Sequence, residues 1–135
     1  MGGFVYADLL ASPEGAEITA LNVQAYGNYD VARFNAIYAN GFGTTATPLV
    51  WGMLGDEYED ATTFVNAMTV LETITKSHGE TTGGAILWEL GDTEIDGVAW
   101  GQGVRLALLA GQTQVTVSNE SVLHHWLNWN HWLNI

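Results

Sequence analysis

The last twelve residues, HHWLNWNHWLNI, hold three of the four histidines and three of the six tryptophans of the chain. Imidazoles are common zinc ligands. His124 and His125 are adjacent, and adjacent side chains point to different sides of a helix or a strand. One chain therefore cannot direct all three imidazoles at one ion, and we predict no metal site within a single chain. Three subunits that each supply one histidine about a three-fold axis are the alternative.

The same tail has large rings with asparagines between them and no lysine, arginine or carboxylate. A tail without cations on a protein of net charge −12 does not fit insertion into a membrane surface. Helical and strand periodicities fit the tail equally well, so both remain open. Aromatic rings give up much solvent-exposed area on contact, which favours an interface between subunits over a sugar-stacking platform. The predicted interface residues are Trp126, Trp129, Trp132 and Leu133.

Carboxylates cluster at residues 56–60, DEYED, and at residues 92–96, DTEID. Calcium favours clustered carboxylate oxygens, but neither stretch has the glycine spacing of a calcium loop. We therefore expect solvated acidic loops. The chain has no cysteine and no GxSxG motif. We expect no catalytic residue and no cofactor, so that a small hydrolase is the weakest alternative.

Fifteen acidic residues face only three cations, Arg33, Lys76 and Arg105. This charge repels phosphate backbones, which argues against nucleic-acid binding. It is typical of a salt-adapted protein, although an ordinary acidic protein fits equally well. No apolar run is long enough to span a bilayer, and the N-terminus does not have the pattern of a secretory signal.

Glycines and alternating apolar residues predict a series of short strands. The predicted strands are Ala16–Tyr26, Val31–Tyr38, Thr47–Leu54, Thr62–Thr75, Gly84–Leu90, Ile95–Gly101, Val104–Ala110 and Thr113–Ser118. Part of Thr62–Thr75 also fits a helix, and Gly111-Gln112 fits a two-residue hairpin turn. Short strands at this spacing predict an all-β fold, an antiparallel β-sandwich. The domain division is a segment 1–15, a sandwich 16–118 and an aromatic tail 119–135.

Two stretches carry a more specific pattern: FNAIYANGFGTTATPLVWGMLGDEYED from Phe34, and FVNAMTVLETITKSHGETTGGAILWELGDTEIDGVAWGQG from Phe64. Together they resemble the H-type lectin domain, which also occurs at the C-terminus of some phage tail fibres, over about residues 16–103. The matching positions are Phe34, Phe42, Pro48, Val50, Trp88, Asp92, Thr93, Ile95, Trp100 and Gly103. The closing motif WGQG departs from the family's W-[IV]-A-[IV]-G, and residues 104–135 extend beyond it.

The resemblance implies a six-stranded antiparallel sandwich, a trimer and carbohydrate binding between subunits. Aromatic rings stack on sugars, and amides bind hydroxyl groups. The candidate carbohydrate-binding residues are Trp51, Asn66, Trp88 and Trp100, with core or trimer contacts as the alternative for each tryptophan. We expect a non-enzymatic, lectin-like virion protein of the tail-fibre type, located in a virion or outside the cell. The expected partners are copies of the chain, other virion proteins and cell-surface glycans. A capsid decoration or tail-assembly protein without a ligand is the alternative.

Overall fold

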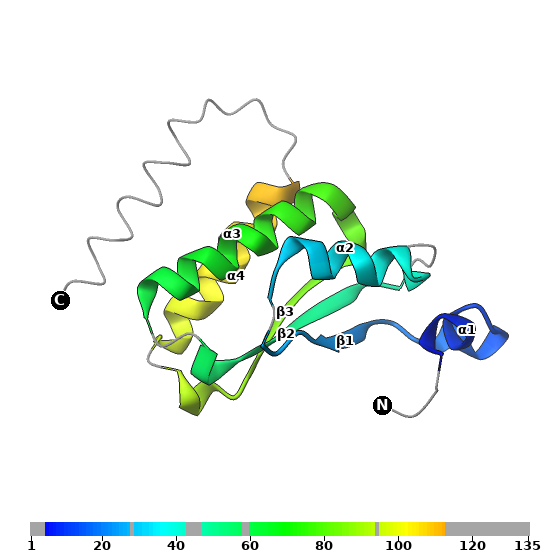
Figure 1. The fold of residues 1–135 in the computed structure, drawn as a ribbon, viewed down its shortest axis with the longest axis horizontal. Helices are drawn as coiled ribbons and strands as arrows, with labels where there is room; N and C mark the ends of the chain where they lie inside the picture. Colours follow the sequence, from blue (N-terminus) through cyan, green and yellow to red (C-terminus); the bar gives the residue numbers. More distant parts are fainter. Residues whose placement is uncertain (1–4, 28, 43–46, 58–59, 94, 113–135) are drawn as a thin grey trace.

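The computed structural model describes residues 5–27, 29–42, 47–57, 60–93 and 95–112. Its described strands form one parallel sheet in the order β1-β2-β3, with a helix after each strand (Figure 1). The elements are α1 (Tyr6–Leu10), η1 (Pro13–Glu17), β1 (Leu21–Gln24), α2 (Val31–Ala39), β2 (Leu49–Leu54), η3 (Gly55–Glu57), α3 (Ala61–His78), η4 (Gly79–Thr81), β3 (Thr82–Trp88), η5 (Leu90–Asp92) and α4 (Gly97–Gln112).

The predicted antiparallel β-sandwich is wrong, because about 62% of the structure is helical and its strands are parallel. The strands predicted at Thr47–Leu54 and Gly84–Leu90 correspond to β2 and β3, and Ala16–Tyr26 contains β1. The other predicted strands within the described residues are helical over most of their length. They are Val31–Tyr38 in α2, Thr62–Thr75 in α3, and Ile95–Gly101 and Val104–Ala110 in α4.

Local chemistry explains why α3 is a helix despite its β-branched residues. Its buried residues, from Phe64 to Thr75, recur at helical spacing, and the Asp60 carboxylate caps the first turn by accepting from Thr63 N at 2.8 Å. Thr69 Oγ1 donates to Val65 O at 3.0 Å, and other hydroxyls along α3 do the same one turn back. These bonds give the hydroxyls partners within the helix, and burial of the apolar face of α3 outweighs the low helix propensity of threonine.

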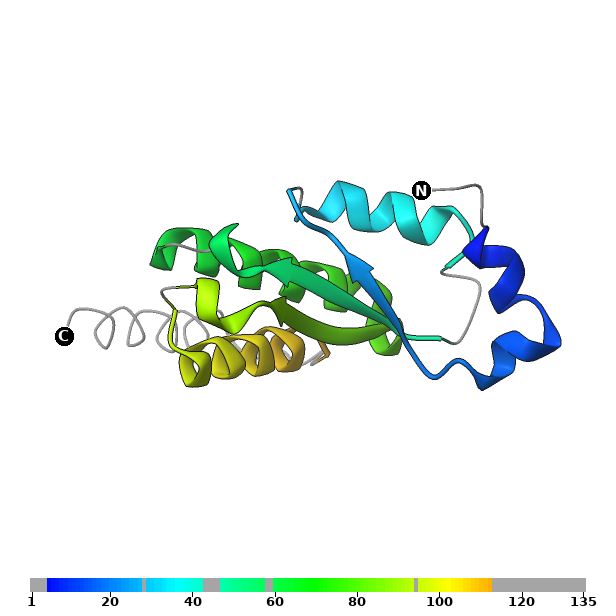
Figure 2. The same cartoon turned by 90° about the horizontal axis from the view of Figure 1, so that it is seen from below.

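The core lies between the sheet and the helices. Trp51 on β2 is 1% exposed, and its ring stacks on Phe34 of α2 with ring centroids 4.1 Å apart. Phe64 and Met68 of α3 and Ala107 of α4 belong to the same core, and α4 packs along α3 next to β3. Figures 1 and 2 show α2 and α3 on the same side of the sheet.

The other side of the sheet carries no described helix, and we call it the open face (Figure 2). The strand register places alternate residues there, opposite the face that holds Val23, Trp51 and Ala85. On β3 the exposed fractions are 36% for Ile86 and 61% for Trp88. The open face consists of Asn22, Gln24, Val50, Leu54, Ile86 and Trp88, none of which is charged.

Close contact between α3 and α4 depends on two glycines of α4. A Cβ atom at Gly103 would lie 2.6 Å from Phe64 Cζ, and one at Gly111 would lie 2.5 Å from Thr75 Cβ. Both distances are shorter than van der Waals contact. The predicted hairpin turn at Gly111-Gln112 is therefore wrong, because these residues end α4 and Gly111 packs against α3.

Gly103→Ala tests this helix contact. Alanine favours a helix over glycine by about 1 kcal/mol, but the clash with Phe64 should reverse the sign and lower the free energy of unfolding by about 1–3 kcal/mol. Gly101→Ala is the matched control, because a Cβ there meets nothing within 4 Å, and it should raise stability. Urea denaturation of the two variants measures both effects. Equal stabilisation by both would show that α3 and α4 do not pack as described.

Candidate functional site

The carboxyl ends of the parallel strands meet at one edge of the sheet, where open α/β folds usually bind ligands. Two acidic turns lie there, η3 after β2 and η5 after β3. A Cβ at Gly55 would lie 2.4 Å from Glu89 O and 3.3 Å from Asp92 Cβ. Glycine at position 55 therefore lets the two turns pack directly against each other.

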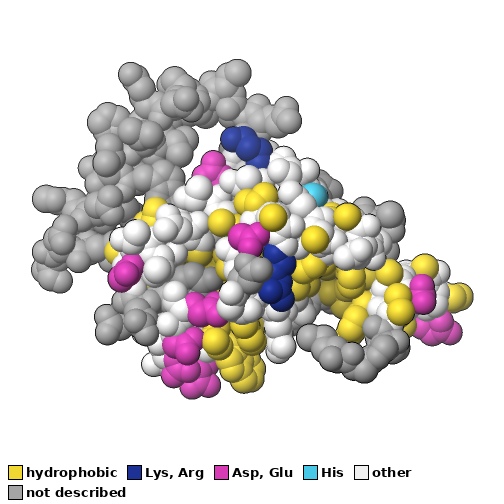
Figure 3. Space-filling view, viewed as in Figure 1, with side chains coloured by type: hydrophobic (Ala, Val, Ile, Leu, Met, Phe, Trp, Pro, Cys, Tyr) yellow, Lys and Arg dark blue, Asp and Glu magenta, His cyan; other side chains and the backbone are white. Residues whose placement is uncertain are grey.

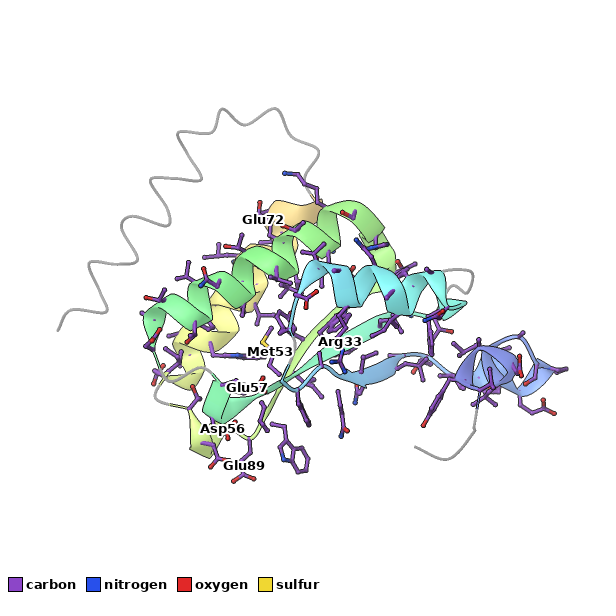
Figure 4. The ribbon with its side chains drawn as sticks, in the orientation of Figure 1. Arg33, Met53, Asp56, Glu57, Glu72 and Glu89 are labelled. Carbon is purple, nitrogen blue, oxygen red and sulfur yellow. The ribbon has the colours of Figure 1, made fainter. Side chains whose placement is uncertain are left out.

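The carboxylates of these turns gather in one corner, where Asp56, Glu57 and Glu89 lie close to the strand ends (Figure 4). The backbone N–H of Gly27, in the loop after β1, donates to Glu57 Oε1. This bond ties the first loop to the second. Within the part of the chain that the structure describes, no three carboxylate or imidazole side chains are placed to hold a metal ion.

Other aspartates at this edge serve as helix caps. Asp30 accepts from Arg33 N at 2.7 Å at the start of α2, and Asp96 accepts from Val98 N at 2.8 Å at the start of α4. The backbone N–H of Thr63 holds the pKa of Asp60 below its usual value. The carboxylates of Asp30, Asp60 and Asp96 are thus engaged in starting helices, as is common for aspartate.

Trp88, the last residue of β3, lies at the same edge and is 61% exposed. In Figure 3 hydrophobic side chains lie beside a group of acidic side chains at the lower edge of the molecule. An exposed indole next to carboxylates supplies both a flat apolar surface and hydrogen-bond acceptors. This corner, made of Trp88, Asp56, Glu57, Glu89 and Asp92, is the candidate site, and we call it the acidic edge.

The predicted carbohydrate-binding residues do not share one surface. Trp51 is buried in the core on the helix side of the sheet, whereas Trp88 lies on the open face. Asn66 is exposed on α3, and Trp100 of α4 is partly buried, with a buried Nε1 that has no hydrogen-bond partner among the described residues. The predicted tail interface, Trp126, Trp129, Trp132 and Leu133, lies outside the described residues, as do His124, His125 and His131.

A second polar cluster, which the sequence did not predict, lies at the opposite end of the sheet. His78 ends α3, and its ring stacks on Tyr38 of α2 with centroids 3.9 Å apart. His78 Nε2 lies 2.8 Å from Asn35 Oδ1, and Tyr38 Oη donates to Thr81 Oγ1 at 2.6 Å. These partners are 43 residues apart, so no local pattern indicates the cluster. It holds the end of α2 against the end of α3.

Burial lowers the pKa of His78 from its ordinary value of 6.5, so the folded protein prefers the neutral imidazole. The unfolded chain takes up this proton at a higher pH than the folded chain does. The contribution of His78 to stability is therefore complete above pH 6.5 and decreases as the pH falls below it.

His78→Gln tests this dependence. As the pH is lowered from about 7.5 to about 5.5, around the usual histidine pKa, the melting temperature of the wild type should decrease relative to that of the variant. The histidines at 124, 125 and 131 are present in both proteins, so the difference isolates position 78. Calorimetry or circular dichroism measures it. The same slope in both proteins would contradict a partly buried imidazole that prefers the neutral form.

No protein-family model, curated protein or solved structure matches the chain. The resemblance to H-type lectins therefore stays a prediction, and the sandwich fold that it implied is wrong. Among the helices that the structure describes, none has the length and hydropathy of a membrane span.

Proposed function

We propose that this chain is a self-assembling structural protein and that the open face of its sheet forms the contact between copies. The observation that supports this most directly is the exposure of Ile86 and Trp88 on a parallel sheet. Parallel sheets occur almost only with both faces covered, because their strands are apolar on both sides. A partner surface is therefore expected on the open face.

The charge distribution favours a contact through this face. The chain has a net charge of −12, so contacts elsewhere tend to set carboxylates against carboxylates. The open face has no charged side chain, and the buried centre of an interface is typically depleted of charge. Tryptophan is also enriched among the residues that dominate binding energy. Trp88 is the residue of the open face that fits this role best.

A homo-oligomeric structural protein is also what the sequence predicts. A capsid decoration or tail-assembly protein is one form of it. The trimeric state, the virion location and the other virion partners stay predictions. A lectin cleft between sandwich subunits does not fit this chain, because its described residues form a parallel sheet with helices and not a sandwich.

Ile86→Asp tests the interface. In light scattering over a range of concentrations, the full-length wild type should form oligomers, and Ile86→Asp should weaken association at least about tenfold, equivalent to about 1.4 kcal/mol. Val98→Asp adds the same charge at an apolar position of α4 that is 68% exposed, and it should leave association unchanged. A monomeric wild type, or equal effects of the two variants, would contradict the proposal.

A second function, carbohydrate binding at the acidic edge, is favoured by the position of Trp88. Its exposed ring can stack on the apolar face of a sugar. The neighbouring carboxylates of Asp56, Glu57 and Glu89 can accept hydrogen bonds from hydroxyl groups. Cell-surface glycans were the expected ligands from the sequence.

A glycan array followed by titration of any bound sugar tests this second function. Trp88→Ala should weaken sugar binding more than about tenfold, since stacked rings supply much of the contact area in such sites. Asn66→Ala changes an exposed residue on α3, in the helix layer, and should bind as the wild type does. Failure of the wild type to bind any glycan would exclude this function and leave the assembly proposal intact.

A further inference from the structure

The open face needs an occupant, and the chain itself contains a segment that fits it. We infer, on the basis of the assembly proposed above, that residues 113–135 of one copy cover the open face of a neighbouring copy. The rival arrangement within the same proposal sets two open faces directly against each other. The charge, composition and length of residues 113–135 favour the first arrangement.

Charge favours the segment over a second open face. Glu120 is the only acidic residue from 113 to 135, and the segment has no lysine or arginine. Of the net charge of −12, the segment therefore contributes −1 and residues 1–112 contribute −11. Two open faces in contact would set two bodies of charge −11 directly against each other. A nearly neutral segment avoids this repulsion between like charges.

The residue types of the segment also match those of the open face. The open face has an apolar part on β2 and β3, and a polar part, Asn22 and Gln24, on β1. The segment combines three tryptophans with asparagines such as Asn128 and Asn130. Its rings can bury Ile86 and Trp88, while its amides can exchange hydrogen bonds with Asn22 and Gln24. An interface with an apolar centre and a polar rim would result.

Length allows the segment to reach another molecule. The described chain ends with α4 at Gln112, and 23 residues follow. A chain of that length spans at most about 75 Å when extended, at about 3.3 Å per residue. The seven residues of β3 span about 23 Å at the same rise per residue. The segment is therefore long enough to leave its own body and cross the sheet of a neighbour.

Such a contact joins two different surfaces of the same chain. Contacts of this kind close into a ring when the rotation between subunits permits it, and otherwise continue as a filament. The trimer expected from the sequence is one such ring. The aromatic tail and the open face would then be the two halves of a single repeated interface.

Disulfide cross-linking between two full-length variants tests the inference, because the chain has no cysteine of its own. Ile86→Cys places one thiol on the open face, and Asn128→Cys places one among the tail tryptophans. After mixing and mild oxidation, we expect mixed dimers of the two variants, which a mass tag on one chain identifies. Val98→Cys mixed with Asn128→Cys is the control, since Val98 is exposed on α4, and it should cross-link at least about tenfold more slowly.

Other products would overturn the inference in distinguishable ways. Dimers of Ile86→Cys with itself as the main product would show two open faces in contact, so that the assembly would stand and the role of the tail would fail. A cross-linked monomer of the double variant at high dilution would show that the tail covers its own body. An oligomer that neither cross-links through position 86 nor responds to Ile86→Asp would contradict the proposed function as well.

Discussion

The direction in which the chain winds is the constraint on which the rest of this structure depends. Connections between parallel strands are right-handed in nearly all proteins. With the strand order β1-β2-β3, each connection moves along the sheet in the same direction, so α2 and α3 lie on one face (Figure 2). That face holds the Trp51–Phe34 stack and the core. The same winding leaves the opposite face of the described sheet without a helix.

The winding also determines where the carboxylates of this acidic chain lie. The described strands all end at one edge, and the helix that follows each of them begins there with an aspartate that caps it. The remaining acids of η3 and η5 lie at the edge where β3 ends with the exposed Trp88. At the other edge, where α2 and α3 end, the Tyr38–His78 stack closes the helix layer with aromatic and hydroxyl contacts. Charge is thus concentrated at the edge and kept off the open face.

The sequence predicted a strand at β2, whose apolar run is continuous, and the structure shows this strand at the centre of a parallel sheet. The strands predicted in α3 and α4 are wrong for two different reasons. In α3, threonines and valines suggested a strand, although Phe64, Met68 and Leu71 recur at helical spacing. In α4, glycines suggested turns, whereas Gly103 and Gly111 are required by contacts with α3 that a single sequence does not reveal. The sequence likewise could not distinguish buried Trp51 from exposed Trp88. Their burial depends on which face of the sheet the helices cover, and a single sequence does not reveal that face.

The central claim is that the open face is covered when copies assemble, and hydroxyl-radical footprinting of Trp88 tests it most directly. The full-length protein would be oxidised at concentrations below and above its association midpoint and examined by mass spectrometry. The account predicts that Trp88 becomes protected on assembly, while Tyr6 of α1, which is 48% exposed, remains reactive. Equal oxidation of Trp88 in the monomer and in the assembly would contradict the account.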